Sequence, residues 1–243
     1  MPHPLLLQAT DCGLYCAAAD LYIDPWVPVP RAVITHAHAD HLLPGCASYL
    51  VARDGLLVTR ARLGDEASIQ TAAYGETIAL SGVELSLHPA GHILGSAQVR
   101  LAYRGEVAVI SGDYRPGPSL TCAPFEPIRC HTFVTESTFG LPIFRWEADD
   151  AVFSGINAWW QINRDSGRAS LLFGYALGKA QRLLASVDPA IGPIYTHGAV
   201  ERLVAAYRAS GVALPPTRPV AEESRARADW RGALIVAPPW AHQ

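Results

Sequence analysis

The feature that most constrains this chain is a run of three histidines and one aspartate at residues 36–41, with the sequence HAHADH. The apolar segment before it, RAVIT, is rich enough in β-branched side chains to form a buried strand, so the run lies where a strand ends. On an extended segment His36 and His38 project to the same side, while Asp40 and His41 can turn towards a second point nearby. Such a run indicates a metal site, because imidazole and carboxylate ligands suit zinc, manganese or iron. The alternative is a polar loop that happens to be rich in histidine.

Two further segments each end a strand-like run with another potential ligand. Residues 83–88 alternate in polarity with period two and lead to His92, whose neighbours Gly91 and Gly95 allow tight turning and close backbone approach. Residues 106–110 are predicted to be a buried strand, and Asp113 follows it, where one carboxylate could bridge two cations. The predicted metal ligands are therefore His36, His38, Asp40, His41, His92 and Asp113.

Taken in order, these motifs resemble those of a known family. The motif HxHxDH, then GHILGSA around His92, then SGD ending at Asp113, is similar to the signature of the metallo-β-lactamase superfamily. Asp24 resembles the early strand-end aspartate that supports the ligands in that fold. The motif TESTFGLP, which contains Glu136, resembles the acidic motif of the β-CASP branch of nucleic-acid nucleases. Within that branch the sequence is most similar to bacterial ligase-associated DNA exonucleases, from about residue 11 to about residue 239.

The resemblance implies an α/β protein, built on an αββα metallo-β-lactamase sandwich with an inserted parallel α/β domain of the β-CASP type. We expect residues 1–144 to form the N-terminal part of the sandwich, with a helix at 62–73, and residues 145–243 to form the insert. In the insert the polarity pattern predicts helices at 148–164, 178–187 and 199–209 and strands at 170–175, 192–196 and 233–237. Such alternation favours a parallel sheet.

Members of this branch carry two more histidine motifs after the insert, and the resemblance implies that this chain, ending at Gln243, is truncated before them. The C-terminal return of the lactamase fold is expected to be absent for the same reason. His197 imitates the last motif, but its position inside the insert favours a structural role. The expected ligands are His36, His38 and His92 for one ion and Asp40 and His41 for a second, weakly held ion, with Asp113 shared.

The implied function is that of a metal-dependent DNA exonuclease in the cytoplasm, with two zinc or manganese ions, acting in DNA repair beside a DNA ligase and a helicase. Asp40, Asp113 and Glu136 are the expected catalytic side chains. Asp40 would orient a water molecule, and Glu136 would pair with a histidine that protonates the leaving oxygen. Three alternatives stay open: an RNA-processing nuclease of the same branch, a small-molecule metallohydrolase, and a truncated metal-binding protein without turnover.

Charge adds little to this prediction. The net charge of −3 provides no overall basic field of the kind that strong non-specific nucleic-acid binders use. Lys179 is the single lysine, and arginine supplies the other basic residues. Because arginine suits bidentate phosphate contacts, Arg115 and Arg145 are candidates for holding a nucleic-acid backbone.

Hydropathy and cysteine usage set two further expectations. No apolar run approaches the roughly 20 residues of a membrane span, and the N-terminus lacks the pattern of a signal peptide. The five cysteines are an odd and scattered set, which does not indicate a disulfide framework. Cys12 and Cys16 are expected to be small buried residues rather than metal ligands.

Overall fold

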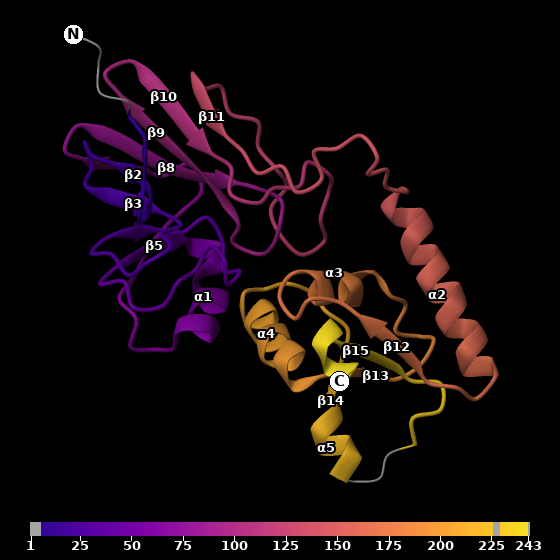
Figure 1. Cartoon of the computed structure of the whole chain (residues 1–243). Coiled ribbons are helices and arrows are strands. Elements are labelled where there is room, and N and C mark those ends of the chain that lie inside the picture. Colours follow the sequence, from indigo (N-terminus) through magenta and orange to yellow (C-terminus); the bar gives the residue numbers. More distant parts are fainter. Residues whose placement is uncertain (1–5, 226–228, 243) are drawn as a thin grey trace. The chain divides into compact units, whose positions relative to one another are not determined.

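The structure, a computed structural model, describes residues 6–225 and 229–242 of the chain (Figure 1). It divides into two compact units, Met1–Ser137 and Thr138–Gln243. Each unit has its own sheet structure and its own buried core, so each is described by itself.

The first unit contains two sheets, of which the N-terminal one has six strands in sequence order. Its strands are β1 (Gln8–Thr10), β2 (Gly13–Cys16), β3 (Leu21–Ile23), β4 (Ala32–Val33), β5 (Tyr49–Ala52) and β6 (Ile69–Ala72). The strands from β1 to β3 pair antiparallel, whereas β3 to β6 pair parallel. Parallel neighbours bring their carboxyl ends to one edge, which places the segment after β4 at that edge.

The second sheet of this unit is a meander followed by one parallel strand. Its strands are β7 (Thr77–Leu80), β8 (Val83–Pro89), β9 (Ala97–Tyr103), β10 (Glu106–Ile110) and β11 (Thr132–Val134). Strands β7 to β10 pair antiparallel and β11 pairs parallel to β10. The strands predicted at residues 83–88 and 106–110 are therefore confirmed.

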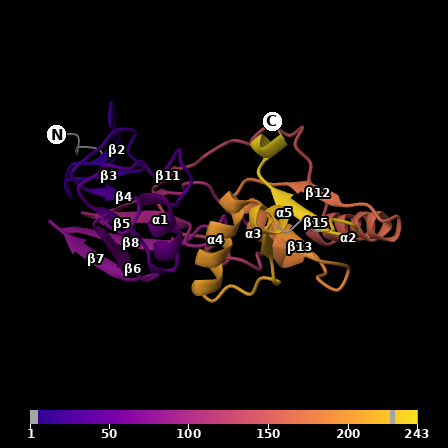
Figure 2. The ribbon, with the colours of Figure 1, turned by 90° about the horizontal axis from the view of Figure 1, so that it is seen from below.

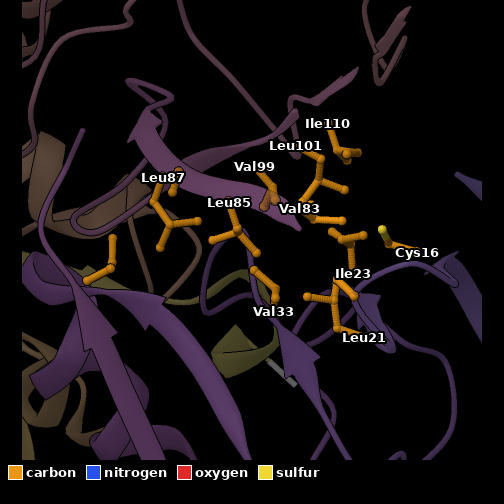
Figure 3. Packing of buried hydrophobic residues seen from close by; sticks show 14 residues of the cluster. Cys16, Leu21, Ile23, Val33, Val83, Leu85, Leu87, Val99, Leu101 and Ile110 are labelled. Carbon is orange, nitrogen blue, oxygen red and sulfur yellow. The ribbon is translucent and has the colours of Figure 1, made fainter. Parts of the chain in front are cut away.

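One apolar core joins the two sheets, as Figure 3 shows. On β8 the side chains of Val83, Leu85 and Leu87 are fully buried at alternate positions, because successive side chains point to opposite faces of a strand. They pack with residues of the other sheet, including Leu21 and Ile23. Burial of the inner faces of both sheets fixes the strand ends that carry the polar residues.

The helix predicted at residues 62–73 is wrong. The structure has a 3₁₀ turn at Arg53–Gly55 and helix α1 at Leu56–Leu63, followed by strand β6. Gly64, with φ of +88°, ends the helix, and its N–H donates to the carbonyl of Arg60. Pairing of β6 with β5 then determines the conformation of a segment whose local propensity is ambiguous.

The second unit alternates helices and parallel strands, as predicted (Figures 1 and 2). In order it contains α2 (Asp149–Asp165), β12 (Ser170–Phe173), α3 (Lys179–Ser186), β13 (Ile194–Thr196), α4 (Gly198–Ala209), β14 (Arg218–Pro219), α5 (Val220–Arg225), β15 (Leu234–Ala237) and a 3₁₀ turn at Pro239–His242. The sheet order is β12-β15-β13-β14, with every pair parallel. Its core includes Trp160 of α2, whose indole N–H donates to the carbonyl of Gly232 at 3.1 Å.

Two expectations from composition can be compared with this fold. Among the described residues, no helix has both the length and the apolar character needed to cross a membrane. All five cysteines are free thiols. Cys16 is buried as predicted, whereas Cys12 is only half-buried, so the prediction for Cys12 is only partly met.

Candidate metal centre

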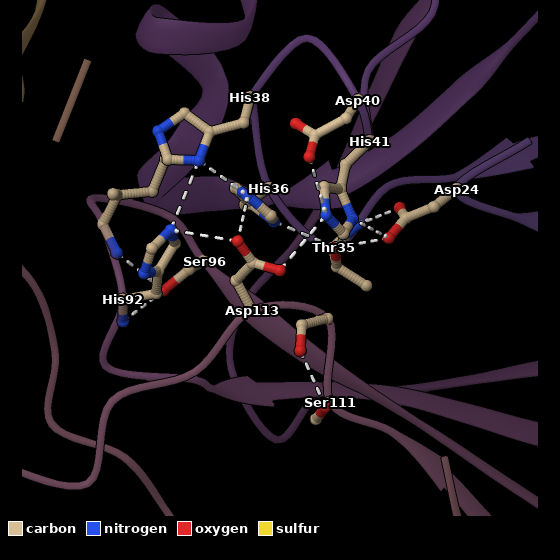
Figure 4. A network of polar contacts seen from close by, with 12 residues as sticks. Asp24, Thr35, His36, His38, Asp40, His41, His92, Ser96, Ser111 and Asp113 are labelled. Carbon is tan, nitrogen blue, oxygen red and sulfur yellow. Dashed lines mark hydrogen bonds and ion pairs between the residues drawn. The ribbon is translucent and has the colours of Figure 1, made fainter. Parts of the chain in front are cut away.

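Three loops, each following a strand of the first unit, bring four predicted ligands together. His36 and His38 come after β4, His92 after β8 and Asp113 after β10. One ligand atom from each of these four side chains lies within 4.8 Å of the others (Figure 4). Residues separated by up to 77 positions thus converge on one point, because the two sheets that share a core end at the same place.

The distances between the ring nitrogens are those of hydrogen-bonding groups. Nε2 of His36 lies 3.0 Å from Nδ1 of His38, and Nε2 of His92 lies 3.2 Å from the same Nδ1. The Asp113 carboxylate completes the cluster, with Oδ2 3.8 Å from Nε2 of His36 and 3.5 Å from Nε2 of His92. Two imidazole nitrogens that face each other this closely need a proton or a cation between them, since two lone pairs repel.

The surroundings keep two of these imidazoles neutral. Burial, helped by the neighbouring histidines, lowers the pKa of His36 well below its usual value. Burial and His38 also lower the pKa of His92 to about 4, although the charges of Asp113 and Glu136 act in the opposite direction. Neutral imidazoles present lone pairs at neutral pH, which is the form that binds a metal ion.

His41 lies on the other side of Asp113, and its pKa is shifted in the opposite direction. Its Nε2 is 3.2 Å from Oδ1 of Asp113, and its Nδ1 donates to Oδ2 of Asp24 at 2.7 Å. Burial alone would lower its pKa, but the bonds to the two carboxylates outweigh burial and raise the pKa of His41 to about 10. Asp40 is the outermost predicted ligand, with Oδ2 3.8 Å from Nε2 of His41 and a side chain that is 78% exposed.

Asp113 therefore faces both groups of ligands, with Oδ2 towards His36 and His92 and Oδ1 towards His41. The hydrogen bond from His41 holds the pKa of Asp113 below its ordinary value, so its carboxylate stays ionised. A carboxylate placed in this way has one oxygen for each of two adjacent cations. His36, His38, His92 and Asp113 fit one divalent ion by donor type and number.

Residues that the sequence did not single out hold the ligands in place. The backbone N–H of Thr35 donates to Oδ1 of Asp24 at 2.8 Å and its hydroxyl donates to Oδ2 at 2.5 Å. In the loop of His92, the hydroxyl of Ser96 accepts the backbone N–H of His92 at 3.0 Å. Tyr74 in turn donates its hydroxyl to the carbonyl of Ser96 at 3.0 Å. Thr35 directly precedes the histidine run and Ser96 lies within the GHILGSA motif, and this position is the one sequence signal that could have found them.

The remaining candidate residues lie outside the cluster of four ligands. The guanidinium of Arg115 donates to the backbone carbonyls of Gly117 and Pro118. Glu136 follows β11, is half-buried, and its charge raises the pKa of His92. His197 caps α4 by accepting the backbone N–H of Ala199 at 3.2 Å, and Arg145 is an exposed residue of the second unit.

Comparison with known proteins shows what this chain is related to. Over 229 residues it is 29% identical to a probable DNA ligase of Opitutus terrae, an alignment that covers 93% of this chain and 22% of the relative. It is 25% identical to an RNase J-like protein of Methanocaldococcus jannaschii, over 81% of this chain and 54% of the relative. It is 31% identical to the endoribonuclease YSH1 of Yarrowia lipolytica, over 49% of this chain and 14% of the relative.

The chain thus spans between about a seventh and about a half of these relatives. No family model matches it. In three dimensions it is similar to a solved protein of unknown function from Enterococcus faecalis, with a TM-score of 0.54 and 11% identity over 84% of this chain and 57% of the other. That similarity concerns the fold alone and agrees with a mixed α/β class.

The relatives and the histidine–aspartate cluster agree with the resemblance seen in the sequence motifs. The homologues of this chain are members of the metallo-β-lactamase superfamily and of its β-CASP branch. The resemblance inferred from the motifs around His36, His92, Asp113 and Glu136 is therefore confirmed at the level of this branch.

Proposed function

We propose that the first unit carries the metal centre of a metal-dependent nuclease. The observation that carries this proposal is the convergence of His36, His38, His92 and Asp113, whose ligand atoms all lie within 4.8 Å of one another. The neutral state of His36 and His92 supports it, because burial lowers both pKa values. The relatives support it too, since their names include RNase J-like protein and endoribonuclease.

Each side chain has a distinct part in the proposed centre. His36, His38 and His92 would hold one ion, His41 and Asp40 a second, and Asp113 would be shared between them. When bound, such a pair of divalent ions supplies Lewis-acid activation of water and of a phosphodiester. Asp24 fixes the ring of His41 from behind by accepting its Nδ1–H, as carboxylates commonly do for metal-binding histidines.

We further propose the lactamase sandwich for residues 1–144 and a β-CASP insert for residues 145–243, with zinc or manganese as the metal. DNA is the proposed substrate, because the relative named as a probable DNA ligase aligns with 93% of this chain. A DNA ligase and a helicase would then be partners in repair, in the cytoplasm. An RNA substrate is the second candidate, since the RNase J-like relative aligns with 81% of the chain.

The first test of this proposal is metal content. His36→Ala and His38→Ala should each abolish tight binding of the first ion, because a four-ligand site that loses one imidazole is left open. His131→Ala is the matched control, since His131 is more than half exposed, lies outside the cluster and should leave metal content unchanged. Unchanged metal content in both cluster variants, by elemental analysis, would show that the site is assigned wrongly.

The second test is cleavage of end-labelled single-stranded DNA, double-stranded DNA and RNA with manganese. Glu136→Gln should lower turnover while sparing metal content, because Glu136 acts on His92 through its charge and is not one of the four clustered ligands. Faster cleavage of RNA than of DNA would favour the RNA-processing function. Turnover of small esters or lactams without cleavage of either polymer would indicate a small-molecule hydrolase.

A further inference from the structure

A polar cluster lies on the second sheet outside the candidate metal centre. Ser86 and His88 are on the face of β8 that turns away from the core residues Leu85 and Leu87. Nδ1 of His88 lies 3.2 Å from Oε2 of Glu126, and its Nε2 lies 3.0 Å from Oγ of Ser86. Because a carboxylate can only accept, Nδ1 donates to Glu126, and in the neutral imidazole the Ser86 hydroxyl then donates to Nε2.

This arrangement has the order of a serine–histidine–acid triad, but its burial argues for another role. Ser86 is 4% exposed in the middle of a paired strand, where a substrate cannot reach its hydroxyl. Glu126, in contrast, has a side chain that is half exposed. What the cluster does is connect Glu126 to the end of β8.

Hydrogen bonds of the backbone also connect Glu126 to the end of β8. The N–H of Glu126 donates to the carbonyl of Pro89 at 3.1 Å. The amide nitrogen of Gln98, a fully buried residue, donates to the carbonyls of Pro89 at 2.9 Å and of Glu126 at 2.7 Å. Pro89 is the last residue of β8 and precedes His92 by three positions.

The loop that ends at Glu126 also begins beside a ligand, since Arg115 follows Asp113 by two positions. The N–H of Arg115 donates to the carbonyl of Ala90 at 2.9 Å. At Gly91 the loop is packed so closely that a Cβ would overlap with the carbonyl oxygen of Arg115 and lie 2.9 Å from the backbone nitrogen of Phe125. The segment that carries His92 therefore packs closely against the segment that follows Asp113.

We infer that Glu126, through its hydrogen bond to His88, is a positioning residue that sets His92 against Asp113. This inference rests on the proposed metal-dependent function. Neither Glu126 nor His88 belongs to the four-residue cluster, so both act through the loops that they join. A metal site tolerates little displacement of its ligands. Groups bonded directly to ligands commonly change metal affinity by about 10- to 100-fold, and Glu126 acts one contact further out, so we expect the lower end of this range.

The experiment compares Glu126→Ala and Glu126→Gln with the wild type in the 243-residue chain. Zinc affinity is measured by competition with a chromophoric chelator, ligand geometry by the visible spectrum of the cobalt(II) form, and stability by thermal unfolding of the metal-free chain. We expect Glu126→Ala to weaken zinc binding about tenfold and to change the cobalt spectrum. Glu126→Gln should restore most of the affinity, because its amide oxygen can still accept from His88.

The matched control is Glu84→Ala, which removes an exposed carboxylate from the same strand β8 and should change none of the three measurements. His88→Gln is a second variant and should weaken zinc binding in the same direction as Glu126→Ala. Wild-type affinity and spectrum in Glu126→Ala would overturn the inference while leaving the proposed function intact. A loss of stability in the metal-free chain without any change in the cobalt spectrum would also overturn it. Failure of the wild type to take up metal would overturn the proposed function, and this inference with it.

Discussion

At the scale of single residues, the candidate centre separates its histidines by protonation state. His36 and His92 are kept neutral mainly by burial, whereas His41, although burial opposes its charge, is held protonated by Asp113 and Asp24. The neutral rings are ready to bind a cation, but His41 must first release a proton from the nitrogen that faces Asp113. The difference follows from the partners of each ring rather than from residue type.

Asp113→Asn tests the shared carboxylate. Asparagine keeps the size of the side chain but removes the charge that would hold two cations close together, so we expect occupancy of both ions to fall. Elemental analysis after dialysis measures this, with Asp65→Asn, an exposed position, as the control that should retain metal. Retained metal together with manganese-dependent cleavage in Asp113→Asn would contradict the bridging role.

The opposite pKa shifts predict a stability maximum for the metal-free chain. A histidine whose folded pKa is lowered favours the folded state above its unfolded pKa of 6.5, and this contribution is lost as the pH falls through about 4, as for His92. A histidine whose folded pKa is raised contributes fully below 6.5, and its contribution is lost as the pH rises through about 10, as for His41. Unfolding temperatures in chelator should therefore be highest near pH 6.5 and fall on both sides.

The alkaline half of that profile can be assigned to one residue. In His41→Gln the decline between pH 6.5 and about 10 should largely disappear, while the acidic decline remains. A wild-type profile that stays flat up to pH 10 would show that His41 is not held protonated by its two carboxylates.

At the scale of elements, the sequence predicted the strands that carry ligands better than the helix expected at residues 62–73. Residues 83–88 and 106–110 have an alternating or continuous apolar pattern, and both form strands. The helix predicted at residues 62–73 is wrong because Ile69–Ala72 pairs with β5, a contact distant in sequence, and forms a strand. The metal motif was visible because its histidines are clustered in sequence. Thr35 and Ser96 were not, because hydroxyl side chains near a turn have many other uses.

The packing between two loops gives a prediction at this scale. A Cβ at Gly95 would overlap with the backbone of Gly55, at the start of α1, and Gly95 also has φ of +76°. Gly95→Ala should therefore lower the free energy of unfolding by well over the roughly 1–2 kcal/mol that a positive φ alone costs. Gly75→Ala is the matched control, with the same φ of +76° and no atom within 4 Å of the added Cβ. Chemical denaturation that gives equal losses for both variants would show that the two loops are not in close contact.

At the scale of the whole molecule, two units with separate cores share one chain. All the predicted metal ligands lie in the first unit, between His36 and Asp113. The parallel sheet of the second unit is stabilised by its own buried residues, such as Trp160 and Leu184. Metal should therefore stabilise one unit directly and not the other.

Hydrogen exchange with and without chelator tests this division. Removing metal should speed amide exchange in the loops after β4, β8 and β10, because those loops carry the ligands. Exchange in α2 and α4 of the second unit should not change and provides an internal control. An equal increase in both units would show that metal acts on the chain as a whole, contrary to the separate cores.

The position of the four clustered ligands has a consequence for the order in which the chain folds. His36 and His38 are fixed by the first sheet, and His92 and Asp113 by the second, so a bound ion would link two layers as a cross-link does. Closing the loop from residue 36 to residue 113 costs chain entropy before any ligand can meet its partners. An ion bound early by residues 36–41 would acquire its remaining ligands, His92 and Asp113, only after this closure. Folding of the apolar core would therefore precede completion of the site, and the ion would act afterwards by slowing the separation of the two sheets.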